Sequence, residues 1–324
     1  MTDATELRCP SCRSPLEDGD RFCEQCGARL MGEEPSRSGC RVCGAPSEAI
    51  DVDGFCAVCG ARERTADDRV ELDLVSAAAV SDRGRVHRRN EDAFHLERLG
   101  GSGVAVVVCD GISSASAGDV AARTAASAAG RILVRALEAR TQDGSAAVLE
   151  GVKAARDSVE RVPWTTRIDR GMPSCTLVCA LCRGGEITVG SVGDSRVYWI
   201  DSDGVRQLTV DDSWAEEQVA DGALTVEQAR ADPRSHSITH WIGADAPERP
   251  PRITALHAGR RGWLLLCTDG LWNYLAGAGE LGALIDALPA GASAAAVARA
   301  LVDTAVLRGG RDNITTAVIE INPS

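Results

Sequence analysis

The apolar residues of this chain gather in short runs rich in Val, Leu, Ile, Ala and Cys, separated by longer amphipathic or polar stretches. Short apolar runs bounded by polar residues are typical of strands that lie inside a sheet, where both faces meet apolar neighbours. The runs predict strands at residues 75–80, 104–109, 175–181, 186–192, 197–200, 263–268 and 314–319.

The amphipathic stretches predict helices at residues 118–139, 146–159, 215–221, 280–287 and 293–307. The last of these has the clearest pattern, because Val297, Leu301 and Ala305 recur at four-residue spacing on one helix face. Ser293 is suited to cap its start, and Gly309 is suited to end it.

The predicted strands cluster in pairs, and the sequences Gly184-Gly185 and Asp203-Gly204 are suited to hairpin turns between them. Paired strands favour two sheets with helices on the outside over a chain of alternating βαβ units. The chain has 324 residues, which is enough for one large α+β domain and a small additional module.

The first sixty residues carry four Cys-x-x-Cys pairs. They are formed by Cys9, Cys12, Cys23, Cys26, Cys40, Cys43, Cys56 and Cys59. Structural zinc takes four ligands in a tetrahedron, so two such pairs complete one site. Gly27, Gly44 and Gly60 follow the second cysteine of three pairs and permit the positive φ of a metal-binding turn. The segments resemble zinc ribbons, which implies one structural zinc at residues 1–33 and another at residues 34–62.

Disulfides and redox Cys-x-x-Cys motifs are the alternatives for these cysteines. We expect neither, because the chain shows no secretory signal and no βαβ context around the pairs. The five remaining cysteines are expected to be small core residues. They are Cys109, Cys175, Cys179, Cys182 and Cys267.

The net charge of −12 and the 3% aromatic content argue against nucleic acid as a partner, since phosphate repels acidic surfaces and bases stack on aromatic rings. We therefore expect the ribbons to contact proteins. No apolar run approaches the length needed to span a membrane. A cytoplasmic protein without membrane contact is predicted.

Acidic residues stand at the ends of several apolar runs, at Glu91-Asp92, Asp110, Asp269 and Asp312. Burying an unpaired carboxylate costs several kcal/mol, so repeated carboxylates at strand ends are explained if they converge on divalent cations. Oxygen ligands favour Mg²⁺ or Mn²⁺ over zinc. A single Asp-Gly sequence is more often only a turn, but four such sites attached to strands are hard to explain in that way.

From about residue 74 to residue 322 the chain resembles the protein phosphatase 2C family of metal-dependent phosphatases, in a bacterial form. The motifs occur in the family's order: Ser81-Asp-Arg-Gly84, Asn90-Glu-Asp92, Val108-Cys-Asp110-Gly111, Gly193-Asp-Ser-Arg196, Leu208-Thr-Val-Asp211-Asp-Ser213, Cys267-Thr-Asp269-Gly270 and Gly310-Arg-Asp312-Asn313. The resemblance implies a four-layer α-β-β-α sandwich, in which two antiparallel sheets are flanked by helices. With the two ribbons in front, we expect a linker at residues 63–72 and the catalytic domain at residues 73–324.

The resemblance also implies a role for each acidic motif. Asp110 would bridge two Mn²⁺ or Mg²⁺ ions, and Asp269 and Asp312 would complete the first site. Glu91 or Asp92, with the carbonyl of Gly111, would serve the second ion. Asp194 would help to hold a third, and His87, Arg88 and Arg89 would bind the substrate phosphate.

The implied activity is hydrolysis of phosphoserine and phosphothreonine in proteins, by direct attack of a water that bridges the two metals. No covalent enzyme intermediate is needed. A serine/threonine kinase or its substrates would be the partners, recruited by the ribbons.

Three departures from the family pattern stand beside this interpretation. His87 occupies the position of a phosphate-binding Arg, so the basic residues around it either take over that role or form a solvated turn. Ile112-Ser113-Ser114 replaces a glycine pair and provides no histidine as general acid, and Met172 to Thr176 departs from Gly-Thr-Thr. Residues 214–233 resemble a substrate-contacting flap but equally suit an ordinary surface helix. The alternative function is a pseudophosphatase scaffold that binds phosphoproteins without hydrolysing them.

Overall fold

The computed structural model describes residues 15, 39–40, 43–51, 54–60, 68–101, 103–141, 143–165, 170–275 and 277–323. The chain forms two compact units, Met1–Arg64 and Thr65–Ser324. The cysteines of the first expected ribbon, Cys9, Cys12, Cys23 and Cys26, lie outside the described residues.

The larger unit is built on two antiparallel sheets. The first has the strand order β1-β2-β13-β12-β8-β9. Its strands are β1 (Arg69–Asp73), β2 (Ala77–Asp82), β8 (Arg196–Asp201), β9 (Gly204–Gln207), β12 (Gly262–Cys267) and β13 (Ile314–Ile321). The second has the order β11-β7-β6-β4-β3. Its strands are β3 (Asp92–Leu99), β4 (Gly103–Asp110), β6 (Leu177–Arg183), β7 (Glu186–Val192) and β11 (Arg252–His257). A short pair, β5 (Ser174–Cys175) and β10 (Ile242–Gly243), lies apart from both.

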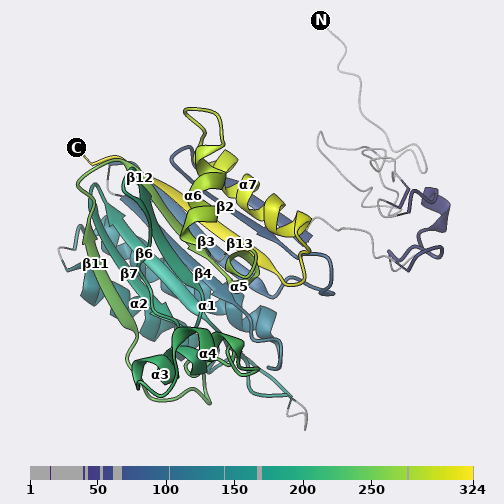
Figure 1. The fold of residues 1–324 in the computed structure, drawn as a ribbon, viewed down its shortest axis with the longest axis horizontal. Helices are drawn as coiled ribbons and strands as arrows, with labels where there is room; N and C mark the ends of the chain where they lie inside the picture. The colour runs from purple at the N-terminus through teal and green to yellow at the C-terminus, as the bar shows by residue number, and fades with distance from the viewer. Residues whose placement is uncertain are drawn as a thin grey trace, which may run out of the picture. The chain divides into compact units, whose positions relative to one another are not determined.

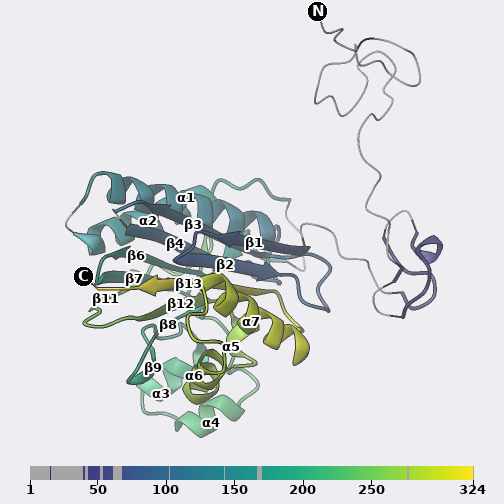
Figure 2. The ribbon, with the colours of Figure 1, turned by 90° about the horizontal axis from the view of Figure 1, so that it is seen from above.

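Helices cover the outer face of each sheet, so that the unit has four layers (Figures 1 and 2). Helices α1 (Gly118–Glu138) and α2 (Gly144–Val159) pack on the five-stranded sheet through an Ala- and Val-rich core. Helices α5 (Asp269–Trp272), α6 (Ala278–Asp286) and α7 (Ala294–Leu307) pack on the six-stranded sheet. A third core fills the space between the sheets. The predicted α-β-β-α architecture is therefore confirmed.

Two short helices, α3 (Trp214–Ala220) and α4 (Val226–Ala231), occupy the segment that resembles a flap. Ser213 caps the first, and Thr225 forms a capping box with Gln228 at the start of the second. None of the described helices combines the length and apolar character that crossing a membrane requires.

The predicted helices all form within two residues of their expected bounds, and Ser293 caps α7 by accepting a hydrogen bond from the Ala296 amide. The five scattered cysteines are buried, as expected. The sequence pattern missed the short helices α4 and α5, the two-residue strand β10, and the strands β1, β3, β9 and β11. These last four are the edge strands of the two sheets, and their mixed polar and apolar residues show no purely apolar run. The first sheet accordingly begins at Arg69, within the stretch that we expected to be a linker.

Candidate functional site

In the smaller unit, four cysteines form a compact cluster. Among the described residues, Cys40, Cys43, Cys56 and Cys59 are the one group of three or more potential ligands whose ligand atoms all lie within 4.8 Å of one another. The Sγ atoms of Cys40 and Cys59 are 3.6 Å apart, and those of Cys43 and Cys56 are 3.7 Å apart. Four sulfurs at the Zn–S distance of about 2.3 Å would be separated by roughly 3.8 Å in a tetrahedron. The cluster therefore has the dimensions of a zinc site.

The two halves of this cluster repeat one local design. The Gly44 amide donates to the Cys40 carbonyl, and the Gly60 amide donates in the same way to the Cys56 carbonyl. Both glycines have a positive φ, 72° and 73°. A Cys-x-x-Cys turn closed in this manner needs a residue without a Cβ after it, which explains the glycine at each position.

The larger unit brings its acidic motifs to one end of the two sheets. Asp92 begins β3 and pairs with Asp110 at the end of β4, so the two residues lie at the same end of the five-stranded sheet. Asp269 follows β12, and Asp312 precedes β13, at the same end of the other sheet. Asp194 lies between β7 and β8, where the chain passes from one sheet to the other. Residues separated by up to 220 positions thus meet because strand ends meet.

Hydroxyl groups hold two of these acidic residues in place, Asp92 through its carboxylate and Asp110 through its backbone amide. Thr268 Oγ1 donates to Asp92 Oδ2 over 2.9 Å, and Thr268 is fully buried. Thr176 Oγ1 accepts from the Asp110 amide at 3.1 Å and lies 2.7 Å from Ser195 Oγ. Thr176 ends the segment in which the chain departs from Gly-Thr-Thr, and it supports the strand end that carries Asp110.

Asn313 joins the loop before β13 to the loop before β3. Its Oδ1 accepts from the Glu91 amide at 2.7 Å, and its Nδ2 donates to the carbonyls of Arg83 at 2.8 Å and Arg89 at 3.1 Å. Gly270 permits this approach, since a Cβ there would lie 1.9 Å from the Asn313 carbonyl oxygen. Sequence reasoning placed Asn313 in a motif but did not reveal that it anchors a loop more than 200 positions away.

Burial makes the charged state of these carboxylates unfavourable. It raises the pKa of Asp92 to about 8 despite hydrogen bonds from Thr315 and Thr268, and the charges of Asp269 and Asp312 add to the rise. Burial and the neighbouring Asp312 raise the pKa of Asp269 to about 6.

The same causes act on the other two buried carboxylates. Burial raises the pKa of Asp110 well above its ordinary value, and the charges of Asp92, Asp269 and Asp312 contribute further. Burial also raises the pKa of Asp194, with Asp269 the first of its acidic neighbours. Clustered carboxylates with raised pKa values are typical of a cation site, because bound cations would stabilise the charged form of each carboxylate.

Two buried oxygens of the cluster, Asp92 Oδ1 and Asp269 Oδ1, have no hydrogen-bond partner among the residues that the structure describes. Buried acceptors without donors are rare in folded proteins and mark places where an ion or water belongs. The donor set is therefore suited to hard divalent cations. Among the described residues, no three of these carboxylates have ligand oxygens that all lie within 4.8 Å of one another. Waters would therefore complete the coordination of a cation here, as they commonly do for Mg²⁺.

Glu91 and Asp92, at the start of β3, differ in the groups that they direct toward the cluster. The Asp92 carboxylate is buried and faces Asp269 and Asp312. Glu91 contributes backbone contacts, with its amide donating to Asn313 and its carbonyl accepting from the Gly111 amide. Gly111 is required at its position, since a Cβ would lie 2.7 Å from the Glu91 carbonyl oxygen and closer still to Gly118.

His87 points back into the cluster. Its Nε2 lies 3.2 Å from Asp312 Oδ1, and its backbone carbonyl accepts from the buried Arg83 guanidinium. Arg88 and Arg89 are exposed next to it. The three residues expected to bind phosphate therefore lie on one loop, with His87 nearest to the carboxylates.

Asp194 is held through its backbone by an aromatic residue of α5. The Trp272 indole donates to the Asp194 carbonyl over 2.9 Å, and the Arg196 guanidinium lies 3.7 Å from the Trp272 ring centroid. Arg196 in turn forms a buried pair with Asp211 at 2.7 Å. The ring of His236, three residues after the flap-like segment, also stacks on Trp272.

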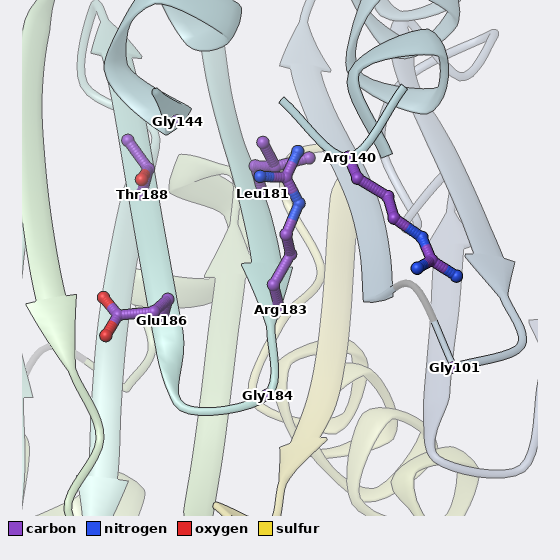
Figure 3. Close-up of a pocket in the computed structure, with 8 residues that line it drawn as sticks. All are labelled: Gly101, Arg140, Gly144, Leu181, Arg183, Gly184, Glu186 and Thr188. Atoms are coloured by element: carbon purple, nitrogen blue, oxygen red, sulfur yellow. The ribbon is translucent and has the colours of Figure 1, made fainter. Parts of the chain in front are cut away.

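A separate pocket of about 670 Å³ lies near the opposite end of β6 and β7 (Figure 3). Arg140, Arg183, Glu186 and Thr188 are among the residues that line it. The Arg183 guanidinium donates to the carbonyls of Ala136 and Thr141, so it closes the end of α1. No member of the carboxylate cluster lines this pocket, and the acidic chemistry belongs to the other end of the sheet.

Residues 83–304 match the family described as protein phosphatase 2C. The chain belongs to this family. Residues 8–30 match a zinc-ribbon domain, and the four-cysteine cluster of the structure follows that segment. The combination of a protein phosphatase 2C domain with zinc ribbons in front of it was predicted from the motifs.

Relatives and solved structures agree with this membership. The chain is 28% identical over 248 residues to the serine/threonine phosphatase stp of Listeria welshimeri, which covers 75% of this chain and 94% of the relative. It is 29% identical over 262 residues to the serine/threonine protein phosphatase PstP of Mycobacterium tuberculosis, which covers 78% of this chain but only 46% of that protein.

Among solved structures, the fold resembles Stp1 of Staphylococcus aureus with a TM-score of 0.65 and 24% identity, covering 80% of this chain and 99% of Stp1. The catalytic domain of PstP, solved in complex with two manganese ions, matches with a TM-score of 0.55 and 25% identity over 78% of this chain and all of that domain. The protein is accordingly an enzyme of the phosphoprotein phosphatase class.

Proposed function

We propose that this phosphatase hydrolyses phosphoserine and phosphothreonine in proteins, with divalent cations held by the carboxylate cluster. The observation that carries the proposal is the convergence of Asp92, Asp110, Asp194, Asp269 and Asp312 at one end of the sheets, with two buried oxygens that lack a donor in the described part of the chain. The serine/threonine phosphatases among the relatives, and the manganese ions in one of them, support it.

The residues would share the ions as their positions suggest. Asp110 stands between the others and would contact two cations, with Asp269 and Asp312 serving one. Asp92, together with Glu91 and the Gly111 carbonyl, would serve the second, and Asp194 a third. When bound, Mn²⁺ or Mg²⁺ would activate a bridging water for direct attack on phosphorus and offset charge on the phosphoryl oxygens.

The loop residues would orient the substrate. His87, Arg88 and Arg89 would bind the phosphate, and the contact of His87 with Asp312 would also fix the orientation of that carboxylate. An imidazole whose Nε2 already lies 3.2 Å from Asp312 Oδ1 offers a phosphate less than an exposed guanidinium does. We therefore expect the two arginines to contribute more to phosphate binding than His87 does.

The zinc ribbons would recruit a protein partner, such as a serine/threonine kinase or one of its substrates. Zinc held at Cys40, Cys43, Cys56 and Cys59 would fold a segment whose own apolar core is very small. Phe55 and Val58 are exposed beside the cluster, which is consistent with a contact surface.

A test compares release of phosphate from a phosphothreonine peptide with and without Mn²⁺. Asp110→Asn and Asp269→Asn should each lower kcat about a hundred- to a thousandfold, the range seen when one electrostatic contributor to a transition state is removed. Asp157→Asn is the matched control, because Asp157 forms a surface ion pair with Lys153 on α2, away from the carboxylate cluster. Retained turnover in both site variants would refute the metal assignment.

The alternative, a phosphoprotein-binding scaffold without turnover, is favoured by one observation. His87 stands where the family has an arginine, and its Nε2 lies 3.2 Å from Asp312 Oδ1. If the wild-type chain folds and binds the phosphopeptide but shows no Mn²⁺-stimulated hydrolysis, the scaffold is the better description.

A further inference from the structure

The loop that precedes β3 is unusually basic for so acidic a protein. Residues 83–89 contain four arginines and His87, while the whole chain has a net charge of −12. Arg83 has a structural role, because it is buried and its Nε lies 3.1 Å from Asp68 Oδ1. The remaining arginines of the loop are exposed.

A second loop adds another exposed cation beside this one. The Arg85 amide donates to the Gly310 carbonyl at 2.7 Å, and a Cβ on Gly310 would lie 3.3 Å from Arg85 Cγ. Arg311 follows Gly310 directly and is exposed. Asn313 fastens both loops together. Arg85 and Arg311 are therefore held side by side at the edge of the carboxylate cluster, within three residues of His87 or Asp312.

Two of the exposed arginines form no ion pair within the described part of the chain. Neither Arg85 nor Arg311 has an acidic side chain within 4.0 Å of its nitrogens among the residues that the structure describes. Arg89 lies 3.5 Å from Asp119, but Asp119 makes its closer pair with Arg123 at 2.7 Å. We call Arg85, Arg89 and Arg311 the arginine rim.

Arg85 and Arg311, which are exposed and have no acidic partner among the described residues, are suited to bind an anion supplied by another molecule. The neighbouring Asp312 side chain is 40% exposed, and the cation that we propose it holds would offset its charge, so it would not neutralise the rim. The exposed Val86 lies between Arg85 and His87 and offers apolar surface to a peptide. The rim thus presents positive charge on the exposed loops beside the carboxylate cluster, where residues flanking a phosphorylated side chain would lie.

We propose that the arginine rim selects phosphorylation sites flanked by acidic residues. This inference rests on the proposed phosphatase function and specifies its substrate class. Exposed ion pairs contribute about 0.2–1 kcal/mol each, so two of them would favour an acidic peptide about two- to thirtyfold at low salt. The preference would weaken with salt, since the screening length falls from about 10 Å at 0.1 M to about 3 Å at 1 M.

The experiment uses the full chain with Mn²⁺ and two phosphothreonine peptides that differ only in carrying Glu or Gln on both sides of the phosphothreonine. The ratio of their kcat/KM values is measured for the wild type, for Arg85→Glu/Arg311→Glu and for Arg98→Glu/Arg135→Glu. The last is a matched control with the same change of charge. Arg98 lies near the far end of β3, and Arg135 is exposed on α1.

We expect the Glu peptide to be preferred by the wild type and by the control, and the preference to be lost or reversed in the rim variant. An equal rate for the two peptides in the wild type, or equal loss in the control, would overturn the inference while leaving the phosphatase function intact. If neither peptide is hydrolysed, the proposed function fails. Fluorescence anisotropy of the labelled peptides in the same buffer then tests the role of the rim through binding alone. Equal affinity for both peptides would overturn that role, and a preference that depends on the rim would support it.

Discussion

Replacing Asn313 with alanine should destabilise the larger unit far more than the loss of one amide suggests. Asn313 is 2% exposed and makes three hydrogen bonds to the backbone of residues 83–91. At a net contribution of about 0.5–1.5 kcal/mol each, their loss should lower the free energy of unfolding by about 2–4 kcal/mol. For a unit of this size the Tm should fall by about 4–8 °C, at roughly 2 °C per kcal/mol.

The loop released by this change carries the residues that we propose to bind phosphate, together with Arg85 and Arg89 of the arginine rim. We therefore expect KM for a phosphopeptide to rise in Asn313→Ala at temperatures where the protein is fully folded. Circular dichroism during thermal and urea unfolding measures the stability, and phosphate release measures KM. Asn313→Asp should keep the bond from the Glu91 amide and lose the two that Nδ2 donates, so its stability should fall between the wild type and Asn313→Ala.

Asn273→Ala provides the matched control. Asn273 is exposed and donates one hydrogen bond, of 3.3 Å, to Asp269. Its replacement should cost about 0.5 kcal/mol or less. If Asn313→Ala unfolds at the same temperature as Asn273→Ala, the bonds from Asn313 do not fasten the loop, and the account of how the two loops are joined is wrong.

Two other changes test the packing around the site and the zinc cluster. Gly270→Ala should lower the free energy of unfolding by about 2–3 kcal/mol, because the new Cβ would overlap the Asn313 carbonyl oxygen. Gly279→Ala is the control on α6, where the new Cβ meets nothing within 4 Å and should raise the free energy of unfolding by about 0.5–1 kcal/mol. Equal unfolding temperatures for the two variants would contradict the close approach at Gly270. Cys56→Ser should reduce the zinc content measured by mass spectrometry by about one ion per chain, and Cys179→Ser, which alters a buried core cysteine, should leave it unchanged. Unaltered zinc in Cys56→Ser would exclude this cluster as a metal site.

The site could be predicted from the sequence to the level of residue identity but not of arrangement. The motifs indicated Asp110, Asp269 and Asp312, because each stands at the end of an apolar run. They left open whether Glu91 or Asp92 faces the cations, and the structure directs the Asp92 carboxylate inward. They also placed His87 at a phosphate-binding position, without indicating that its imidazole lies against Asp312.

The supporting residues were beyond sequence reasoning. Thr268, Thr176 and Trp272 carry no local pattern that predicts their partners, since each bonds to a segment far away in the chain. The same holds for Arg311, which lies beside Arg85 only because two loops are joined. A single sequence contains no information on such contacts until the strands have been paired.

The sequence alone determined which segments are central strands and helices, because burial on both faces of a strand or on one face of a helix requires an apolar pattern that can be read locally. It also determined the metal-binding character of the cysteine pairs, through their fixed spacing. Only the tertiary structure decided which segments form the edge strands, because their polar residues are compatible with an exposed loop as well as with a strand. It also decided that carboxylates from both sheets meet. That meeting depends on the register of strands distant in the chain, which is set by the packing of the whole domain and not by any one segment.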